Sequence, residues 1–222
     1  MQIKIYRCLE GAQKARGLTV LFDVFRASNT IIACLAGGAE FVLPIGDLDE
    51  AHRLKKQHPG YMLLGERNGI PPKGFDGDNS PAKAACMDLE HKKIILTTSA
   101  GSQGIVHANQ ADLLVIGSFA NAKAITEYIR AQQPEIVSLL AIGLNAIDPA
   151  HEDEACAQYI QQLLDTQDSE FAKIQEDLLA CNGADRLRRL HQHEDLLFCT
   201  TMDSHPIVPV FDALSGRITK LV

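Results

Sequence analysis

Short apolar runs alternate with segments of helical apolar spacing along the first two-thirds of this chain. Runs of this length with few polar residues are typical of strands that are buried on both faces of a parallel sheet. We therefore predict an α/β fold in which helices cover both faces of a parallel or mixed sheet. The runs are LTVLF (18–22), FVLPI (41–45), YMLLGE (61–66), IILTT (94–98), DLLVIGS (112–118) and IVSLLAIG (136–143).

Helix signals lie between and after these runs. A helix is expected in ASNTIIACLAGG (27–38), with Ser28 as its N-cap and Gly37 and Gly38 as its stop, and another in DLDEAHRLKKQH (47–58). Three helices and three closing strands are predicted for the last third of the chain, with Asn182 and Gly183 separating the second helix from the third. The helices are 152–167, 169–181 and 184–192, and the strands are LLFCTTMD (196–203), PIVPVF (206–211) and ITKLV (218–222), the last after a turn at SGR (215–217).

Composition predicts one cytoplasmic domain over residues 1–222. A hydrophobic content of 46% suffices for one large core. The net charge of -7 indicates neither a nucleic-acid surface nor a membrane surface, no apolar stretch approaches the roughly 20 residues of a membrane helix, and the first residues lack the apolar block of a secretory signal. The cysteines have no CxxC or zinc-like spacing, so we expect reduced thiols. RLRRLHQH (186–193) is interpreted as a solvated helix face outside the site, and homo-oligomerisation is left open.

Polar residues follow five of the predicted strands, at the end where ligands bind in open α/β sheets. Each also has a structural explanation, because Asp, Ser and Thr cap helices and acids favour a first helical turn. Their agreement about one edge of the sheet is the stronger signal. They are Asp23 and Arg26, Glu66 and Arg67, Thr97 with Thr98 and Ser99, Ser118 and Asn121, and the acids at 152–154.

The functional hypothesis is a site for a small phosphorylated acid. N–H groups at a helix N-terminus bind anions, and Gly101 allows close approach of the chain. Arg26 and Arg67 can hold phosphate or carboxylate through paired hydrogen bonds. The nearby carboxylates would repel such a substrate unless a cation lay between them, which points to Mg²⁺, and the attacking group is then Asp23 or a metal-bound water. These carboxylates are Asp23, Glu66, Asp76, Glu152 and Asp153.

Several familiar sites lack their motifs in this sequence. There is no GxGxxG after the first run, no GxxxxGK[ST] loop, and no cysteine followed by a phosphate loop that ends in arginine. The irregular segment RNGIPPKGFDGDNSP (67–81) is long for a loop in a compact domain, and such loops are more often functional than idle.

Five motifs in consistent order resemble the 2-phosphosulfolactate phosphatase family. They are DVFRASNT (23–30), GERNGIPPKGFDGDNSP (65–81), ILTTSAGSQG (95–104), GSFANA (117–122) and HEDEACA (151–157). The resemblance implies a three-layer α/β/α fold and an Mg²⁺-dependent phosphatase that converts 2-phosphosulfolactate to sulfolactate and phosphate. The family activity belongs to coenzyme M biosynthesis.

The motifs and the residue pattern together predict a complete site. Arg26 and Arg67 would hold the two anionic ends of the substrate, and the metal ligands would be Asp23, Glu152 and Asp153. The residues expected to be catalytic are Asp23, Arg26, Glu66, Arg67, Glu152 and Asp153. Those expected to bind substrate are Asp76, Asn79, Ser80, Thr97, Thr98, Ser99, Gly101, Ser118 and Asn121.

Two segments depart from the family pattern. Ala100 stands where the family typically has the asparagine of TTTNGT, and GLNAIDPAH (143–151) replaces a GTEG-like segment. Both lie where we expect substrate or metal, so the preferred substrate can differ from that of the family. Two alternatives are left open: a small-anion binding protein without turnover, and an enzyme of other chemistry, such as a lyase or isomerase, on the same scaffold.

Overall fold

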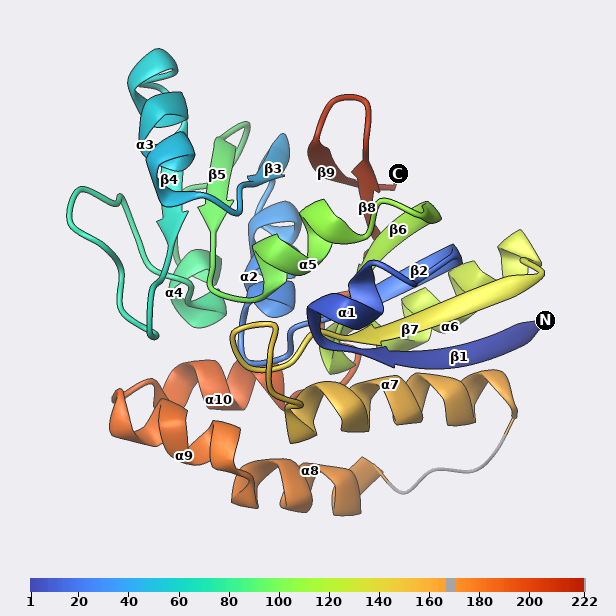
Figure 1. The fold of residues 1–222 in the computed structure, drawn as a ribbon. Coiled ribbons are helices and arrows are strands. Elements are labelled where there is room, and N and C mark those ends of the chain that lie inside the picture. Colours follow the sequence, from blue (N-terminus) through green and yellow to red (C-terminus); the bar gives the residue numbers. More distant parts are fainter. Residues whose placement is uncertain (167–170, 222) are drawn as a thin grey trace.

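The computed structural model describes residues 1–166 and 171–221, which include a mixed sheet of nine strands. The strands are β1 (Gln2–Arg7), β2 (Gly17–Phe22), β3 (Phe41–Pro44), β4 (Met62–Gly65), β5 (Lys93–Thr97), β6 (Ala111–Gly117), β7 (Ile136–Ala141), β8 (Pro209–Asp212) and β9 (Arg217–Lys220). Their order in the sheet is β1-β7-β2-β6-β8-β9-β3-β5-β4. Helices lie on both faces (Figure 1), so the predicted three-layer α/β/α fold is confirmed.

The sheet consists of two parallel groups joined by an antiparallel hairpin. Strands β1, β7, β2 and β6 pair in parallel, as do β3, β5 and β4. The hairpin β8–β9 lies between the groups, because β8 pairs with β6 and β9 pairs with β3 through Val42 and Ile218. The two groups run in different directions (Figure 1), which brings carboxyl ends from both of them to the centre of the molecule.

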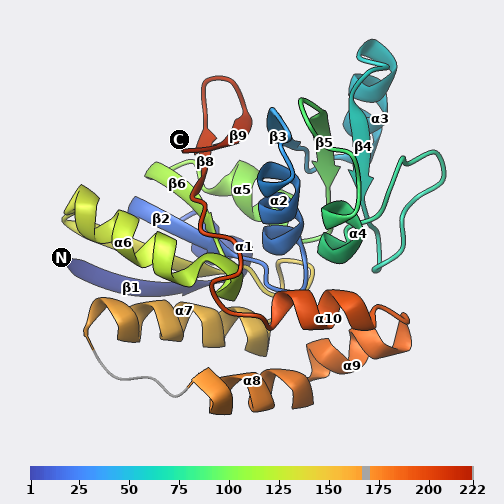
Figure 2. The ribbon, with the colours of Figure 1, turned by 180° about the vertical axis from the view of Figure 1, so that it is seen from behind.

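The helices follow the sheet strands and fill the outer layers. They are α1 (Cys8–Ala12), α2 (Ala27–Ala36), α3 (Leu48–Gln57), α4 (Pro81–Ala85), α5 (Gly101–His107), α6 (Ala122–Gln132), α7 (His151–Leu164), α8 (Phe171–Ala180), α9 (Asn182–Arg189) and α10 (His193–Cys199), with a 3₁₀ turn at Phe119–Asn121. Helices α7 to α10 lie together at one side of the molecule in both views (Figures 1 and 2). None of the described helices is long and apolar enough to cross a membrane.

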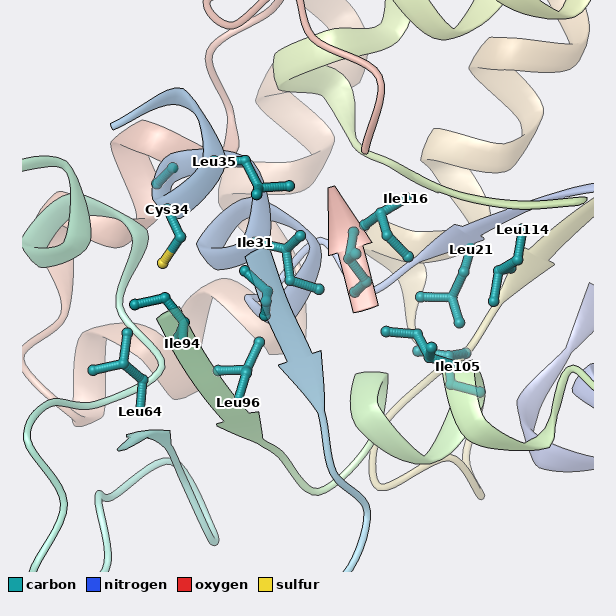
Figure 3. Packing of buried hydrophobic residues seen from close by; sticks show 14 of the residues in the cluster. Leu21, Ile31, Cys34, Leu35, Leu64, Ile94, Leu96, Ile105, Leu114 and Ile116 are labelled. Carbon is teal, nitrogen blue, oxygen red and sulfur yellow. The ribbon is translucent and has the colours of Figure 1, made fainter. Parts of the chain in front are cut away.

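Buried apolar side chains form separate clusters against the sheet. One cluster joins α1, α2, α4 and α5 to both strand groups; in Figure 3, Ile105 lies beside Leu21 and Leu114, while Ile94 and Leu64 lie near Cys34. A second cluster packs α6 to α10 against β2, β6 and β7, and a smaller one packs α3 against β4 and β5. Burial on this scale supplies the main driving force for the fold.

Three details differ from the sequence-based expectations. The strand predicted at 196–203 is wrong, because its first half is helix α10, which buries Leu196 and Cys199 on one face. Ser28 does not cap α2; it lies inside the helix and accepts a hydrogen bond from Asp23 N at 2.9 Å. The structure also adds an edge strand, β1, where no strand was predicted.

The other predicted strands are confirmed to within a few residues, and the Gly37 stop of α2 is confirmed as its C-cap. Asn182 and Gly183 open α9, so the break between α8 and α9 falls at Cys181. Residues 167, 169, 170 and 222 of the predicted helices and last strand lie outside the described residues.

Candidate active site

A pocket of about 240 Å³ lies where the carboxyl ends of strands from both parallel groups meet. Its wall comes from the segments after β2, β4, β5 and β7, the first turn of α7, and α9, an arrangement typical of ligand sites in open α/β sheets. The lining residues are Asp23, Phe25, Arg26, Glu66, Asn68, Gly69, Asn79, Ser99, Ala100, Gly143, Leu144, Asn145, Ala150, Glu152, Asp153, Arg186, Leu187 and Leu190.

Asp23 follows β2 directly and lies buried at the bottom of this wall. Its Oδ1 accepts a hydrogen bond from Ala27 N at 3.2 Å, in the first turn of α2. Burial raises the pKa of Asp23 from 3.8 to about 6; the neighbouring Glu66 raises it too, whereas the Ala27 and Gly101 N–H groups and the Arg186 guanidinium lower it. The charged form of Asp23 is therefore held against a desolvation cost.

Asp153 joins three elements of the pocket. Its Oδ1 accepts from Val24 N at 2.7 Å and its Oδ2 accepts from Gly143 N at 2.9 Å, so α7 is tied to the ends of β2 and β7. Burial raises the pKa of Asp153 well above its usual range, and the charges of Asp23 and Glu152 raise it further. Glu152 precedes it and is also buried, with Oε2 lying 3.7 Å from Cys181 Sγ.

Glu66 organises the loop after β4. Its side chain accepts from Ser99 N at 2.8 Å, Gly69 N at 2.7 Å and Ser99 Oγ at 3.2 Å. The loop passes tightly against α9, since a Cβ atom at Gly69, where φ is +81°, would lie 2.5 Å from Leu190 Cδ1. Glu66 thus holds the segments that follow β4 and β5 together at the pocket wall.

Arg26 lines the pocket but already has a partner of opposite charge. Its Nη1 lies 2.7 Å from Asp195 Oδ2 of α10, and both side chains are almost fully buried. Asp195 Oδ1 also accepts from Ser80 Oγ at 2.5 Å and from Ala82 N at 3.1 Å. The pair and its hydrogen bonds fasten α10 to α4 and to the start of α2.

Several predicted site residues lie outside the pocket wall. Arg67 donates to the carbonyls of Glu66 and Gly46 and to Thr97 Oγ1, so its guanidinium is used between loops. Asp76 accepts from Leu63 N and pairs with Lys55. These contacts hold the long loop at 67–81 against β4 and α3.

The hydroxyls after β5 divide between two tasks. Thr98 Oγ1 accepts from Ser102 N at 3.0 Å and so stabilises the first turn of α5, whereas Ser99 lies on the pocket wall. Gly101 is not on the wall, yet it touches the site: a Cβ atom there would lie 2.8 Å from Asp23 Oδ2 and 2.7 Å from Ala27 Cβ. Glycine is therefore required where α5 meets Asp23.

Ser118 and Asn121 lie after β6, away from the pocket wall. Asn121 Oδ1 accepts from Ser118 N at 2.8 Å, and Asn121 Nδ2 donates to the carbonyls of Ile116 and Ile207. These bonds hold the chain before β8 against the end of β6. Of the five predicted strand ends, the structure brings together at the pocket those after β2, β4, β5 and β7.

Comparison with known proteins decides the family. The family model for 2-phosphosulpholactate phosphatase matches residues 5–213. The chain belongs to the 2-phosphosulpholactate phosphatase family. It is 34% identical over 213 residues to a probable 2-phosphosulfolactate phosphatase of Carboxydothermus hydrogenoformans, covering 90% of this chain and 88% of the relative. The corresponding proteins of Thermotoga petrophila and Bacillus subtilis are 31% identical (86% and 87% covered) and 29% identical (90% and 89% covered).

Both departures from the pattern of the 2-phosphosulpholactate phosphatase family lie on the pocket wall. Ala100 lines the pocket where the family typically has an asparagine, and four residues of the segment 143–151 line it as well. The part of the pocket wall that departs from the family pattern is thus formed by the segment after β5 and the segment after β7. A substitution at these positions changes the shape and polarity that a ligand meets.

Sequence reasoning missed the contribution of α9. Arg186, Leu187 and Leu190 face the pocket, although the run that contains them was interpreted as a solvated helix face outside the site. That interpretation holds for Arg189, which is exposed, whereas Arg188 is half-buried and donates to the Leu179 carbonyl at 2.6 Å. No local signal separates Arg186 from its neighbours, because the pocket is a contact with segments far away in the chain. The other additions belong to segments next to predicted site residues; they are Phe25, Asn68, Gly69, Ala100, Gly143, Leu144, Asn145 and Ala150.

The candidate ligands for a metal ion in this family member are the carboxylates of the pocket wall. Asp23, Glu66, Glu152 and Asp153 bring buried carboxylates of like charge to one wall, and a cation would relieve their repulsion. Within residues 1–166 and 171–221, no three His, Cys, Asp or Glu side chains are grouped so as to hold one ion. Mg²⁺ does not require such a group, since it commonly takes one or two carboxylates and completes its shell with water and substrate oxygens.

Proposed function

We propose that this protein is an Mg²⁺-dependent phosphatase that hydrolyses 2-phosphosulfolactate, or a related small phosphorylated carboxylic or sulfonic acid. The observation that carries the proposal is the pocket itself: buried carboxylates and a guanidinium converge at the strand ends of a chain that belongs to this phosphatase family. In the net reaction an oxygen of water becomes bonded to phosphorus, the bond from phosphorus to the C2 oxygen of the acid breaks, and that C2 oxygen takes up a proton that the water gives up.

Asp23 and Glu152 would hold the magnesium ion, and water and substrate oxygens would complete its shell. The bound ion would neutralise charge on the phosphate oxygens and stabilise the charge that develops on the leaving oxygen. Glu152 has more unused lone pairs than Asp153, both of whose oxygens accept backbone N–H groups. Asp153 also fixes the position of the first turn of α7 and hence of Glu152.

Asp23 works as an ionised carboxylate in this proposal. Ionisation is needed whether Asp23 binds the cation or attacks phosphorus, and the N–H groups of Ala27 and Gly101 stabilise the charged form. Glu66 keeps the loop with Asn68 and Gly69 at the wall, and Ser99 presents its hydroxyl beside it. Phe25 and Leu187 reduce the access of water and strengthen electrostatic interactions in the pocket.

The test is release of inorganic phosphate from synthetic 2-phosphosulfolactate by the purified protein, first with Mg²⁺ and then with EDTA. We expect release that requires Mg²⁺ and returns when the ion is restored. Asp49→Asn, which removes an exposed carboxylate on α3, serves as a control and should release phosphate like the unmodified protein. Folded protein that releases no phosphate from this compound or from related phosphorylated acids would refute the proposal.

A further inference from the structure

We infer that Arg186 binds an anionic group of the substrate other than the phosphate, a carboxylate or a sulfonate, and that it thereby sets specificity for acids that have such a group. The inference rests on the proposed function, because it assigns a partner within the same pocket. It replaces Arg26 and Arg67 in the role that the sequence suggested for them.

The charges of the wall make a free cation necessary. Four carboxylates line the pocket, and the basic side chains on the same wall are Arg26 and Arg186. Arg26 is neutralised by Asp195 at 2.7 Å in a pair that excludes solvent, and Arg67 is bonded between loops outside the wall. 2-Phosphosulfolactate has a carboxylate and a sulfonate besides its phosphate. A magnesium ion can offset the charge of the phosphate, and Arg186 is the cation on the wall that remains for one of the other two groups.

Arg186 retains most of its hydrogen-bonding capacity. Its Nη2 donates to the Phe25 carbonyl at 3.0 Å, and it forms no ion pair with any other residue that the structure describes. A guanidinium has five N–H donors, and its planar fork matches a carboxylate or sulfonate. The bond to Phe25 holds one edge of the guanidinium, so the remaining donors are positioned before a ligand binds.

Asn79 is a further polar side chain of this wall. It lies on the same wall with 4% of its surface exposed, and its buried Oδ1 has no hydrogen-bond partner among the described residues. A buried amide without a partner costs free energy, so native proteins usually supply one. A hydroxyl or a water that donates a hydrogen bond to Oδ1 would satisfy this side chain.

Helix α9 also shapes the surroundings of Arg186. Leu187 and Leu190 line the pocket beside it, and Leu190 packs against the backbone of Gly69. An ion pair that forms next to apolar side chains is weakened less by water than an exposed pair. A second anionic group held here would therefore distinguish such a substrate from a simple phosphate ester.

The test compares the binding of two probes, sulfolactate and inorganic phosphate, by titration calorimetry. Arg186→Gln should weaken binding of sulfolactate by roughly 10- to 100-fold, since a hydrogen-bonded charge is lost. Its affinity for inorganic phosphate, measured with Mg²⁺, should change by no more than about twofold, and Arg186→Lys should restore part of the sulfolactate affinity. Arg189→Gln removes the same charge from an exposed position of α9 and should bind both probes like the unmodified protein.

Unchanged sulfolactate affinity in Arg186→Gln, or an equal loss for both probes, would overturn the inference. Unmodified protein that does not bind sulfolactate would overturn it as well. The phosphate-release assay separates this inference from the proposed function. If Arg186→Gln releases phosphate from the substrate with an unaltered KM, the role of Arg186 is refuted and the proposed phosphatase activity is not. If sulfolactate binding depends on Arg186 but the protein releases no phosphate, the phosphatase activity is refuted and the role of Arg186 is not.

Discussion

Asp23 has to remain charged in a place where burial disfavours charge. The pKa of about 6 expresses that conflict, since burial raises it while the N–H groups of Ala27 and Gly101 lower it. Residues that carry function often cost stability in this way. The cost follows a defined pH dependence, because the unfolded chain has the ordinary aspartate pKa of 3.8.

Asp23→Asn is expected to abolish phosphate release and to stabilise the metal-free protein at high pH. Between pH 3.8 and about 6 native Asp23 binds more protons than the unfolded chain, so its contribution to stability falls as pH rises through this range and stays low above it. We expect the free energy of unfolding of the variant to be about 1–2 kcal/mol higher at pH 8. This net gain is the relief of the desolvation cost less the contribution of one lost hydrogen bond. Urea unfolding of both proteins in EDTA at pH 8 and pH 4 measures the difference in free energy of unfolding. A gain in stability that is larger at pH 4 than at pH 8 would contradict the prediction.

Gly101→Ala tests the close contact of α5 with Asp23. The new methyl group would lie 2.8 Å from Asp23 Oδ2 and 2.7 Å from Ala27 Cβ, so the carboxylate or the helix has to move. We expect kcat to fall at least about tenfold and the free energy of unfolding to fall by about 1–3 kcal/mol. Gly60→Ala is the control, since nothing lies within 4 Å of its added Cβ; equal kcat values for both variants would refute the prediction.

Helix α10 is an element whose position is decided by charge as well as by apolar packing. Leu196 and Cys199 pack into the core with α6 to α9, while Asp195 is buried against Arg26, Ser80 and the N–H group of Ala82. A sequence window of apolar and threonine residues favours a strand at 196–203. The buried contacts of Asp195 favour the helix instead.

Asp195→Ala should be much more damaging than removal of an exposed acid in the neighbouring helix. The substitution leaves the Arg26 guanidinium buried without a counter-charge, so we expect a loss of about 3–5 kcal/mol in free energy of unfolding. Asp185→Ala breaks the exposed pair with Arg188 and should cost at most about 1 kcal/mol. Urea unfolding of both variants at pH 7.5 compares them, and similar losses would show that the buried pair has no special weight.

The molecule as a whole depends on the hairpin β8–β9 to unite its two strand groups. Among the described strands, the β6–β8 and β9–β3 pairings carry the sheet from one group to the other. The pocket draws residues from both groups, from β2 and β7 on one side and from β4 and β5 on the other. A site built from both strand groups requires that the two groups keep a fixed position relative to each other.

Ile218→Ala tests this connection. Ile218 is fully buried in the cluster that both groups share, so we expect a loss of about 2–4 kcal/mol in free energy of unfolding from the missing side-chain contacts. Thr219→Ala changes the next, exposed position of β9 and should cost at most about 1 kcal/mol. Chemical denaturation followed by circular dichroism measures both, and a loss in Ile218→Ala no larger than in Thr219→Ala would contradict the prediction.

The sequence alone was sufficient for the strand core, the fold class and the edge of the sheet that forms the pocket. Each of these depends on local pattern: apolar runs identify buried strands, and polar residues directly after a run must lie at its carboxyl end. Asp23, Glu66 and Ser99 were placed near one another on that basis, and the structure brings them to one wall.

The tertiary structure decided which charges are free to meet a ligand. Arg26 is neutralised by Asp195, which lies 169 positions away in the chain, while Arg186 enters the wall from a run that has the pattern of a solvated helix. The free energy of a charged side chain is set by its partners and by the water around it, and both depend on segments that only folding brings together.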